Sequence, residues 1–232
     1  MIGIGIGIGF TGRFKTASDI LGDTTIIASW LKADDLTTIT KDGSNLVSSW
    51  RDKNGTGHDL AQVTGASQPL WITPGTIRFD GIDDSMFTGA FTWVRPLTEF
   101  IIVKGITSNI NLTISDGLLV NRCKTYFGAG NSQVSIFCGS ALGPTAAPGD
   151  NTWFILKTVF NGANSLIQIN QQTPITGNSG TSYQRGGFTL GARGSGTDYW
   201  ANVEFKEYIA IYGNLSENDS SIIYNYLLTR IP

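Results

Sequence analysis

From residue 25 to residue 212 the sequence is a succession of short runs rich in β-branched and aromatic residues, separated by Gly, Asn, Asp, Ser and Pro. Runs of this length that are bounded by turn residues are typical of β-strands. Strands are predicted at residues 25–30, 77–79, 100–105, 112–115, 118–126, 133–138, 153–160, 165–169, 187–192 and 203–212. Because no helical pattern alternates with these runs, the sequence favours an all-β antiparallel two-sheet sandwich, or jelly roll, over a fold of βαβ units.

One helix is predicted at the C-terminal end. Ser216 is a favourable N-cap residue, and Asp219 follows it three positions later. The apolar side chains that come next share one helical face: Ile222, Ile223, Tyr226 and Leu227. This spacing predicts an amphipathic helix.

Composition and charge exclude several classes of protein. The chain has 16 basic and 18 acidic residues without a basic cluster, so no nucleic-acid partner is expected. Glycine makes up 29 of the 232 residues and only 15% are charged, against about 25% in average domains, which argues against a helical bundle. One His and two Cys are too few for the usual structural zinc modules, so no metal site is predicted from them.

The first ten residues alternate between apolar residues and glycine. The apolar side chains after Met1 are Ile2, Ile4, Ile6, Ile8 and Phe10. In a strand they share one face and leave bare backbone on the other. Three interpretations stay open: the segment pairs within its own sheet, it docks on a neighbouring subunit, or it is disordered. We assign residues 1–24 to an attachment or oligomerisation arm and residues 25–232 to the globular domain, and we expect a homo-oligomer.

The same segment bears on membrane insertion and secretion. It is nearly half glycine, has no basic residues ahead of it and is far shorter than the ~20 residues of a membrane span. Neither a membrane span nor a signal peptide is therefore expected.

The two cysteines are related by a predicted hairpin. If Gly130 and Asn131 form a two-residue loop, Cys123 and Cys138 face each other across the two strands. The sulfur atoms are then close enough for a disulfide. Because no secretion signal is predicted, we expect two neighbouring free thiols instead.

Two motifs resemble ligand-binding loops but lack the necessary context. The GIGFTG stretch at residues 7–12 matches the dinucleotide fingerprint, yet no parallel βαβ unit follows it. The DKNGTG stretch at residues 52–57 resembles the first half of a calcium loop, but Val63 stands where the closing carboxylate is needed. We interpret the second stretch as a turn held by Asx hydrogen bonds.

No catalytic residue is predicted. A serine or cysteine nucleophile would have to use His58 as its base, and that residue lies in a turn-rich stretch without a nucleophile motif. Glycoside hydrolysis needs two carboxylates about 5 to 9 Å apart. No predicted strand carries two acidic residues at positions i and i+2, the spacing that places them on one face.

Glu207 is unusual because it lies among apolar residues. In a regular strand it shares one face with four of them: Val203, Phe205, Ile209 and Ile211. A carboxylate buried there needs a partner, for which Arg78 and Arg193 are the expected residues. We interpret Glu207 as a structural strut between strands.

Aromatic residues in loops suggest a binding site. Trp71 lies between two prolines, and Trp200 follows Asp198 and Tyr199 in a glycine-rich loop. An aromatic ring stacks on the apolar face of a sugar while nearby carboxylates accept hydrogen bonds from its hydroxyls. The alternative is that these rings only close the ends of the sandwich. The candidate carbohydrate-binding residues are Trp71, Asp83, Asp84, Asp198, Tyr199 and Trp200.

Several segments, in order and spacing, resemble one family. They are residues 29–62, the QPLW and IRFDGIDDSM stretches at residues 68–71 and 77–86, residues 151–170 and residues 188–228. Together they resemble LamG-like jelly-roll domains of the concanavalin A-like lectin/glucanase superfamily. The resemblance covers nearly the whole chain from residue 25 to residue 231.

This resemblance implies two curved antiparallel sheets of about six or seven strands each, but no single activity. Members include glycan-binding modules, adhesion domains, glucanases and virion proteins of bacteriophages. The E-x-D-x-x-E strand of the catalytic members is missing here, so the resemblance implies no hydrolase activity. Some members bind calcium at the rim, where Asp80, Asp83, Asp84 and Asp198 are the nearest carboxylates for a loosely bound ion; no other cofactor is expected.

We therefore expect a non-enzymatic structural protein of a bacteriophage virion, either a capsid-decorating, a fibre or a tail component, assembled in the host cytoplasm. The expected partners are other virion proteins or sister subunits, together with a host-surface glycan. A stand-alone carbohydrate-binding module and a glycan hydrolase of the same fold are the alternatives.

Overall fold

The structure is a computed structural model that describes residues 15–93, 95–106, 112–118, 122–128, 131–183, 186–194, 196 and 198–232. The predicted arm residues Ile2, Ile4, Ile6, Ile8 and Phe10, and the fingerprint-like stretch at residues 7–12, lie outside the described residues. Within these residues no helix combines the length and hydropathy that crossing a membrane requires.

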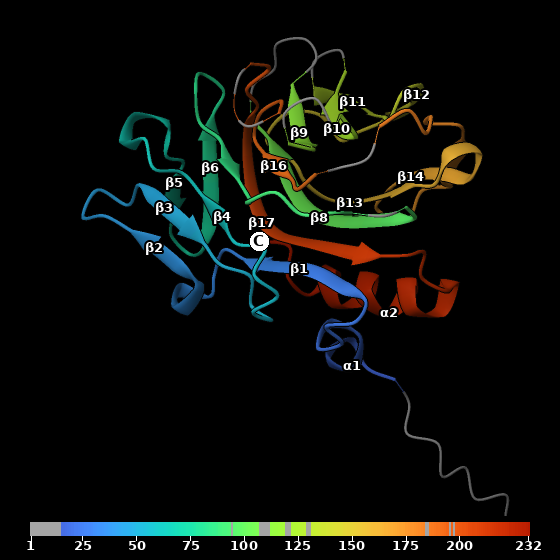
Figure 1. Ribbon diagram of the computed structural model, residues 1–232, viewed down its shortest axis with the longest axis horizontal. Helices are drawn as coiled ribbons and strands as arrows, with labels where there is room; N and C mark the ends of the chain where they lie inside the picture. The colour runs from blue at the N-terminus through green and yellow to red at the C-terminus, as the bar shows by residue number, and fades with distance from the viewer. Residues whose placement is uncertain are drawn as a thin grey trace, which may run out of the picture.

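Two antiparallel sheets pack face to face, which confirms the predicted sandwich (Figure 1). Sheet A has the order β15 (Ile175–Gly177), β14 (Ser165–Ile169), β13 (Trp153–Phe160), β8 (Leu97–Gly105), β17 (Asn202–Tyr212), β6 (Thr76–Asp80), β5 (Leu70–Ile72), and β1 (Ile27–Lys32) also pairs with β17. Sheet B has the order β12 (Ala141–Ala146), β11 (Gln133–Phe137), β10 (Lys124–Phe127), β9 (Thr113–Asp116), β16 (Thr189–Leu190), β7 (Met86–Phe87), β4 (Leu60–Ala61), β3 (Val47–Trp50), β2 (Ile39–Lys41).

In the part of the chain that the structure describes, the sheets have eight and nine strands, more than the family resemblance implied. β13 and β14 have the predicted bounds. Among the described residues of the runs predicted at 118–126 and 187–192, the strands are β10, which extends to Phe127, and the two-residue β16. Several further strands were not predicted, among them β12, whose sequence ALGPTA contains both Gly and Pro. Such segments have low intrinsic β-propensity and become strands because a neighbouring strand pairs with them.

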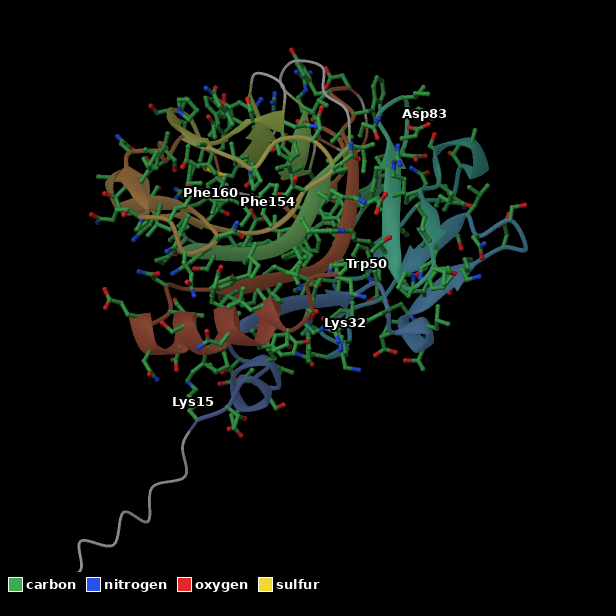
Figure 2. The ribbon with its side chains drawn as sticks, turned by 180° about the vertical axis from the view of Figure 1, so that it is seen from behind. Lys15, Lys32, Trp50, Asp83, Phe154 and Phe160 are labelled. Carbon is green, nitrogen blue, oxygen red and sulfur yellow. A yellow bond between two sulfur atoms is a disulfide. The ribbon has the colours of Figure 1, made fainter. Side chains whose placement is uncertain are left out.

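The main core lies between the two sheets and is built from large apolar side chains. Trp50, Phe127, Phe154, Phe160 and Phe205 are fully buried there. Figure 2 shows Phe154 and Phe160 in the interior between the layers and Asp83 at the edge of the molecule. A second apolar cluster lies on the opposite side of sheet A, beneath the helices.

The C-terminal helix α2 (Glu217–Leu228) confirms the predicted one. The Ser216 hydroxyl accepts a hydrogen bond from the Asp219 N–H at 3.1 Å, and Ile223 and Leu227 are buried in the second cluster. A short helix that was not predicted, α1 (Ala17–Leu21), begins at a Thr16 capping box and contacts α2. Figure 1 shows both helices on the side of sheet A that faces away from β9–β12. Single 3-10 turns occupy Leu36–Thr38, Gly65–Ser67 and Gly162–Asn164.

The central strand β17 contains a β-bulge between Phe205 and Glu207. A bulge inserts one extra residue and moves the following side chains to the other face of the sheet. Val203 and Phe205 therefore point into the core between the sheets, whereas Ile209 and Ile211 point toward the helices. The prediction that all four share one face with Glu207 is wrong because the sequence pattern assumed an unbroken strand.

Glu207 is fully buried on the helix side of β17. Its carboxylate accepts hydrogen bonds from Trp30 Nε1 at 2.6 Å and from the Tyr226 hydroxyl at 2.9 Å, and it forms an ion pair with Arg230 Nε at 3.2 Å. The same guanidinium pairs with Asp34. Burial and the adjacent Glu207 carboxylate raise the pKa of Tyr226 far above its ordinary value, so the phenol remains a hydrogen-bond donor.

The structural role predicted for Glu207 holds, but the predicted partners are wrong. Arg78 pairs with Glu204 at 3.7 Å, and Arg193 pairs with Asp198 at 2.6 Å. The bulge turns Glu207 toward α2, so that Arg230 beyond the end of that helix is the arginine it meets. Glu207 consequently joins a strand to a helix.

The predicted register of the hairpin between β10 and β11 is confirmed, because Lys124 pairs with Phe137 and Thr125 with Ile136. Directly beyond these pairs, Cys123 and Cys138 form a disulfide. The prediction of two free thiols is therefore wrong: it rested on the lack of a predicted secretion signal, whereas the geometry of facing strand residues brings the sulfur atoms together.

We predict that Glu207→Gln lowers the free energy of unfolding by about 2–4 kcal/mol, because it breaks a buried ion pair while Arg230 remains in place. Urea unfolding followed by tryptophan fluorescence measures this change. Glu217→Gln makes the same chemical change on an exposed residue of α2 and should have little effect. Equal effects of the two substitutions would contradict the structural role of Glu207.

Candidate functional site

Two loops that carry most of the predicted site residues meet at one end of the sandwich. The first connects β6 to β7 and contains Asp83 and Asp84; the second connects β16 to β17 and contains residues 198–200. Gly196 approaches Ser85 so closely that a Cβ there would lie 2.2 Å from the hydroxyl oxygen, and both Gly81 and Gly196 have positive φ. Glycine is needed at such positions because a side chain would be strained and would clash. We call this end of the sandwich the rim.

The β6–β7 loop gathers three carboxylates. Oxygen atoms of Asp80, Asp83 and Asp84 lie within 4.8 Å of one another. Asp84 is buried and accepts a hydrogen bond from the Asp80 N–H at 2.9 Å, while Asp80 accepts one from the Ile82 N–H at 2.8 Å. Burial, with a smaller contribution from the neighbouring carboxylates, raises the pKa of Asp84 to about 7.

These three residues offer the oxygen ligands that a calcium ion prefers, although calcium takes 6–8 oxygen ligands in total. A cation here would require further ligands from backbone carbonyls or water. Asp198, the fourth carboxylate considered, does not join the cluster and instead pairs with Arg193.

A second group of side chains lies around the exposed Tyr199, which is 41% exposed and has a φ of 53°. The Arg193 guanidinium lies 5.0 Å from its ring centroid, and Lys124 Nζ lies 5.5 Å from it. The same ammonium lies 4.1 Å from the ring centroid of Tyr126, and Asp198 completes the group through Arg193. We call Lys124, Tyr126, Arg193, Asp198 and Tyr199 the tyrosine patch.

The tyrosine patch is held against strands β9 and β10 of sheet B by backbone hydrogen bonds. The Thr113 N–H on β9 donates to the Tyr199 carbonyl at 3.0 Å, and Thr113 pairs with Tyr126 on β10. The loop carrying Tyr199 is thereby fixed beside two strands rather than projecting freely, and a ring held in place loses little entropy when a ligand stacks on it.

The electrostatics of the patch favour an anion. Burial lowers the pKa of Lys124, and the nearby Arg122 and Arg193 lower it further, while Asp116 and Asp198 oppose this. Arg122 pairs with Asp116 at 3.0 Å. Because Arg122 and Arg193 each have a carboxylate partner, these three cations and two carboxylates carry one net positive charge, which an anionic ligand would balance.

The two tryptophans of the predicted site lie differently. Trp200 follows Tyr199 directly, is half-buried, and has a buried Nε1 without a hydrogen-bond partner among the described residues. Trp71 lies on β5 opposite Ile77 of β6. Ile77 is three residues before the end of β6, where the acidic loop starts. The Trp71 Nε1 donates to the Ala33 carbonyl at 2.8 Å, and Lys41 covers the Trp71 ring. The structure therefore does not bring Trp71 to the rim.

The calcium-like stretch is an Asx-stabilised turn, as interpreted from the sequence. The buried Asp52 carboxylate accepts hydrogen bonds from the backbone N–H groups of Trp30 and Thr56, both at 2.6 Å. Its oxygens are thus used by the fold. His58 stacks on Phe91 with 3.7 Å between ring centroids, and one of its ring nitrogens lies 2.7 Å from the Ala28 carbonyl.

Glu99 on β8 is a fully buried carboxylate that was not predicted from the sequence. It accepts hydrogen bonds from four hydroxyls, those of Ser115, Thr125, Thr158 and Tyr208, at 2.6–3.1 Å. Ser115 and Thr125 belong to sheet B, so this cluster connects the two sheets. Glu99 could have been recognised from the sequence as the single acidic residue in the apolar run LTEFIIVKG, at a position that faces the core. Hydroxyl residues at core-facing positions of other strands are its partners.

No family model and no curated protein sequence matches the chain. Solved structures do match its fold. Trypanosoma rangeli sialidase in complex with sialic acid has a TM-score of 0.61 at 13% identity, over 87% of this chain and 33% of that one. The binding domain of Paraclostridial Mosquitocidal Protein 1 has a TM-score of 0.62 at 12% identity, over 89% and 53%. The binding domain of Botulinum Neurotoxin DC in complex with SialylT has a TM-score of 0.60 at 13% identity, over 87% and 51%.

The chain thus spans about a third of the sialidase and about half of each toxin binding domain. At such identities the likeness shows the fold alone, a two-sheet β-sandwich. It also corrects the expectation that the protein is not an enzyme. Sialidases contain this fold, so neither the fold nor the missing E-x-D-x-x-E strand is a basis for excluding catalysis.

We predict that the raised pKa of Asp84 makes the protein less stable as the pH rises from about 4 to about 7. Between these pH values Asp84 is deprotonated in the unfolded chain but still protonated in the folded protein, so the free energy of unfolding falls as the pH rises. Above about pH 7 the folded protein bears the full free-energy cost of burying the Asp84 charge. Asp84→Asn should flatten this dependence and raise the unfolding free energy at pH 8 by about 1–2 kcal/mol after allowance for solvent screening.

Urea unfolding at pH 5 and pH 8 tests this. Asp83→Asn is the control, because it removes a neighbouring charge but leaves the Asp84 carboxyl to titrate. A wild-type profile and an Asp84→Asn profile with the same slope would show that Asp84 is not the group responsible.

Proposed function

We propose that this protein is a glycan-binding domain that holds a sugar at the tyrosine patch. The observation that carries the proposal is an exposed tyrosine in a left-handed conformation that lies beside two cationic side chains and whose backbone is fixed to sheet B. Two of the structural neighbours are binding domains of toxins, one of them in complex with SialylT, and a sialidase neighbour is in complex with sialic acid.

Each part of the patch has a role that suits an acidic glycan. The Tyr199 ring offers a flat surface for the apolar face of a sugar. Lys124 and Arg193 can donate charge-assisted hydrogen bonds to a carboxylate on the glycan. Asp198, held by Arg193, can accept a hydrogen bond from a sugar hydroxyl.

We predict that sialyllactose binds more tightly than lactose and that Tyr199→Ala lowers the affinity for sialyllactose at least about tenfold, which corresponds to the ~1.4 kcal/mol expected of one stacked ring. Isothermal titration calorimetry measures both affinities. Trp71→Phe is the control, since Trp71 lies away from the rim and this change keeps a ring in its packing site. Unchanged affinity in Tyr199→Ala, or a loss in Trp71→Phe instead, would overturn the assignment of the site.

We further propose that the domain belongs to a bacteriophage virion and is attached through residues 1–24. The support is the resemblance to LamG-like domains of virion proteins and the Ile-Gly alternation of the first ten residues. Lys15, where the described residues begin, and Asp83 at the rim lie at opposite ends of the molecule in Figure 2. Attachment at one end would leave the rim open to a host glycan.

If residues 1–24 mediate assembly, deleting residues 1–12 should leave a folded sandwich that sediments as a monomer, whereas the full chain sediments as an oligomer. Analytical ultracentrifugation compares the two, and circular dichroism verifies that the truncated chain is folded. The same oligomeric mass for both chains would show that the arm has no role in self-assembly.

A further inference from the structure

A groove of about 520 Å³ lies on the helix side of sheet A, between α2 and strands β13 and β14. This volume falls within the range of about 300–1,000 Å³ found for small-molecule sites. Its apolar surface comes from Phe100, Leu166, Pro174 and Tyr224. Most of the remaining lining consists of carboxamides and hydroxyls: Gln168, Asn170, Gln171, Asn225, Ser220 and Ser221.

Lys157 on β13 supplies the only cation in the lining of this groove. Its ammonium lies 2.9 Å from the Ser220 hydroxyl oxygen and 5.6 Å from the Phe100 ring centroid. Burial lowers the pKa of Lys157, and only the more distant Glu217 opposes this. An ammonium group has three donors, and no carboxylate of the described residues forms an ion pair with this one.

Two of the carboxamides in the groove are already held in place. Asn170 has a φ of 50°, and its Oδ1 accepts a hydrogen bond from the Ile155 N–H at 2.9 Å. Gln168 donates through Nε2 to the Gln172 carbonyl at 3.1 Å. Groups fixed before binding lose little conformational entropy when a ligand arrives, which favours specific recognition.

We propose that this groove binds a small hydroxyl-rich carboxylate, such as a sugar acid, with the carboxylate on Lys157 and Ser220 and the hydroxyls on the surrounding carboxamides. A ligand carboxylate can contact the half-buried ammonium directly, which Glu217 in the same lining does not do. Each carboxamide offers both a donor and an acceptor, which matches hydroxyls, since these also do both. One negative charge is favoured over two because Glu217 lies in the lining.

This site is separate from the tyrosine patch and does not depend on the function proposed there. Figure 1 shows α2 on the outer side of sheet A and β10 in the other sheet. The groove is lined from α2, β13 and β14, whereas Lys124 and Tyr126 belong to β10. Substitutions in one site can therefore be tested without altering the other.

The experiment compares D-glucuronate with D-glucose, which differ at one carbon by the presence of a carboxylate. The unmodified full chain is labelled with ¹³C-lysine, and the Lys157 Cε signal is assigned by its loss in Lys157→Gln. We expect glucuronate to shift this signal and to raise the pKa that it reports, with at least about tenfold higher affinity than glucose. Lys157→Gln should abolish the preference for glucuronate, Lys157→Arg should retain part of it, and Asn225→Ala should weaken binding several-fold.

Tyr199→Ala separates the two sites, because it should leave the glucuronate response of Lys157 unchanged. The proposal is overturned if glucuronate leaves the Lys157 signal and its pKa unaltered, or if Lys157→Gln still prefers glucuronate. A glucuronate affinity that is lost in Tyr199→Ala and kept in Lys157→Gln would place sugar-acid binding at the tyrosine patch instead. Sialyllactose binding tests the tyrosine patch separately. It should be lost in Tyr199→Ala and unchanged in Lys157→Gln.

Discussion

The β-bulge in β17 sets which side chains of this central strand face the core between the sheets and which face the helices. β17 pairs with β8 along its length, with β6 before the bulge and with β1 after it. Because the bulge exchanges the two faces, one strand supplies Phe205 to the core between the sheets and Ile209 to the cluster under the helices. It also directs Glu207 toward α2, where Trp30, Tyr226 and Arg230 satisfy its charge. The C-terminal helix is therefore held by a buried ionic network as well as by apolar packing.

Carboxylates serve different purposes at different depths of this molecule. Glu207 and Glu99 are fully buried and satisfied by hydroxyl, indole or guanidinium donors, so their role is to connect elements. Glu99 joins β8 to the neighbouring sheet through Ser115 and Thr125, and these strands, β9 and β10, also support the rim. At the rim, Asp198 is partly exposed and is held by Arg193. The hydrogen bonds of the buried Glu99 thus stabilise the strands β9 and β10, which support the exposed side chains of the rim.

The two faces of the sandwich differ in chemistry. The tyrosine patch combines exposed aromatic rings with cations on sheet B, whereas the groove beside α2 combines carboxamides with one half-buried ammonium on sheet A. In each, the cation lies beside an aromatic ring and burial lowers the pKa of the lysine, Lys124 in the first and Lys157 in the second. A lysine held in this way gains more from an anionic ligand than a fully hydrated one, because part of its desolvation has already occurred.

Four features can be inferred from the amino-acid sequence alone: the all-β class, the bounds of β13 and β14, the Ser216 cap of α2 and the register that places Cys123 opposite Cys138. These features depend on local residue periodicity and turn chemistry, which a single sequence displays. Four others become evident only in the folded chain: the face of Glu207, its arginine partner, the disulfide and the separation of Trp71 from the rim. A β-bulge cannot be recognised from the alternation of residues in the sequence. Contacts between residues far apart in the chain depend on which strands become neighbours. The same holds for the groove with Lys157, whose lining residues are brought together only when α2 packs on sheet A.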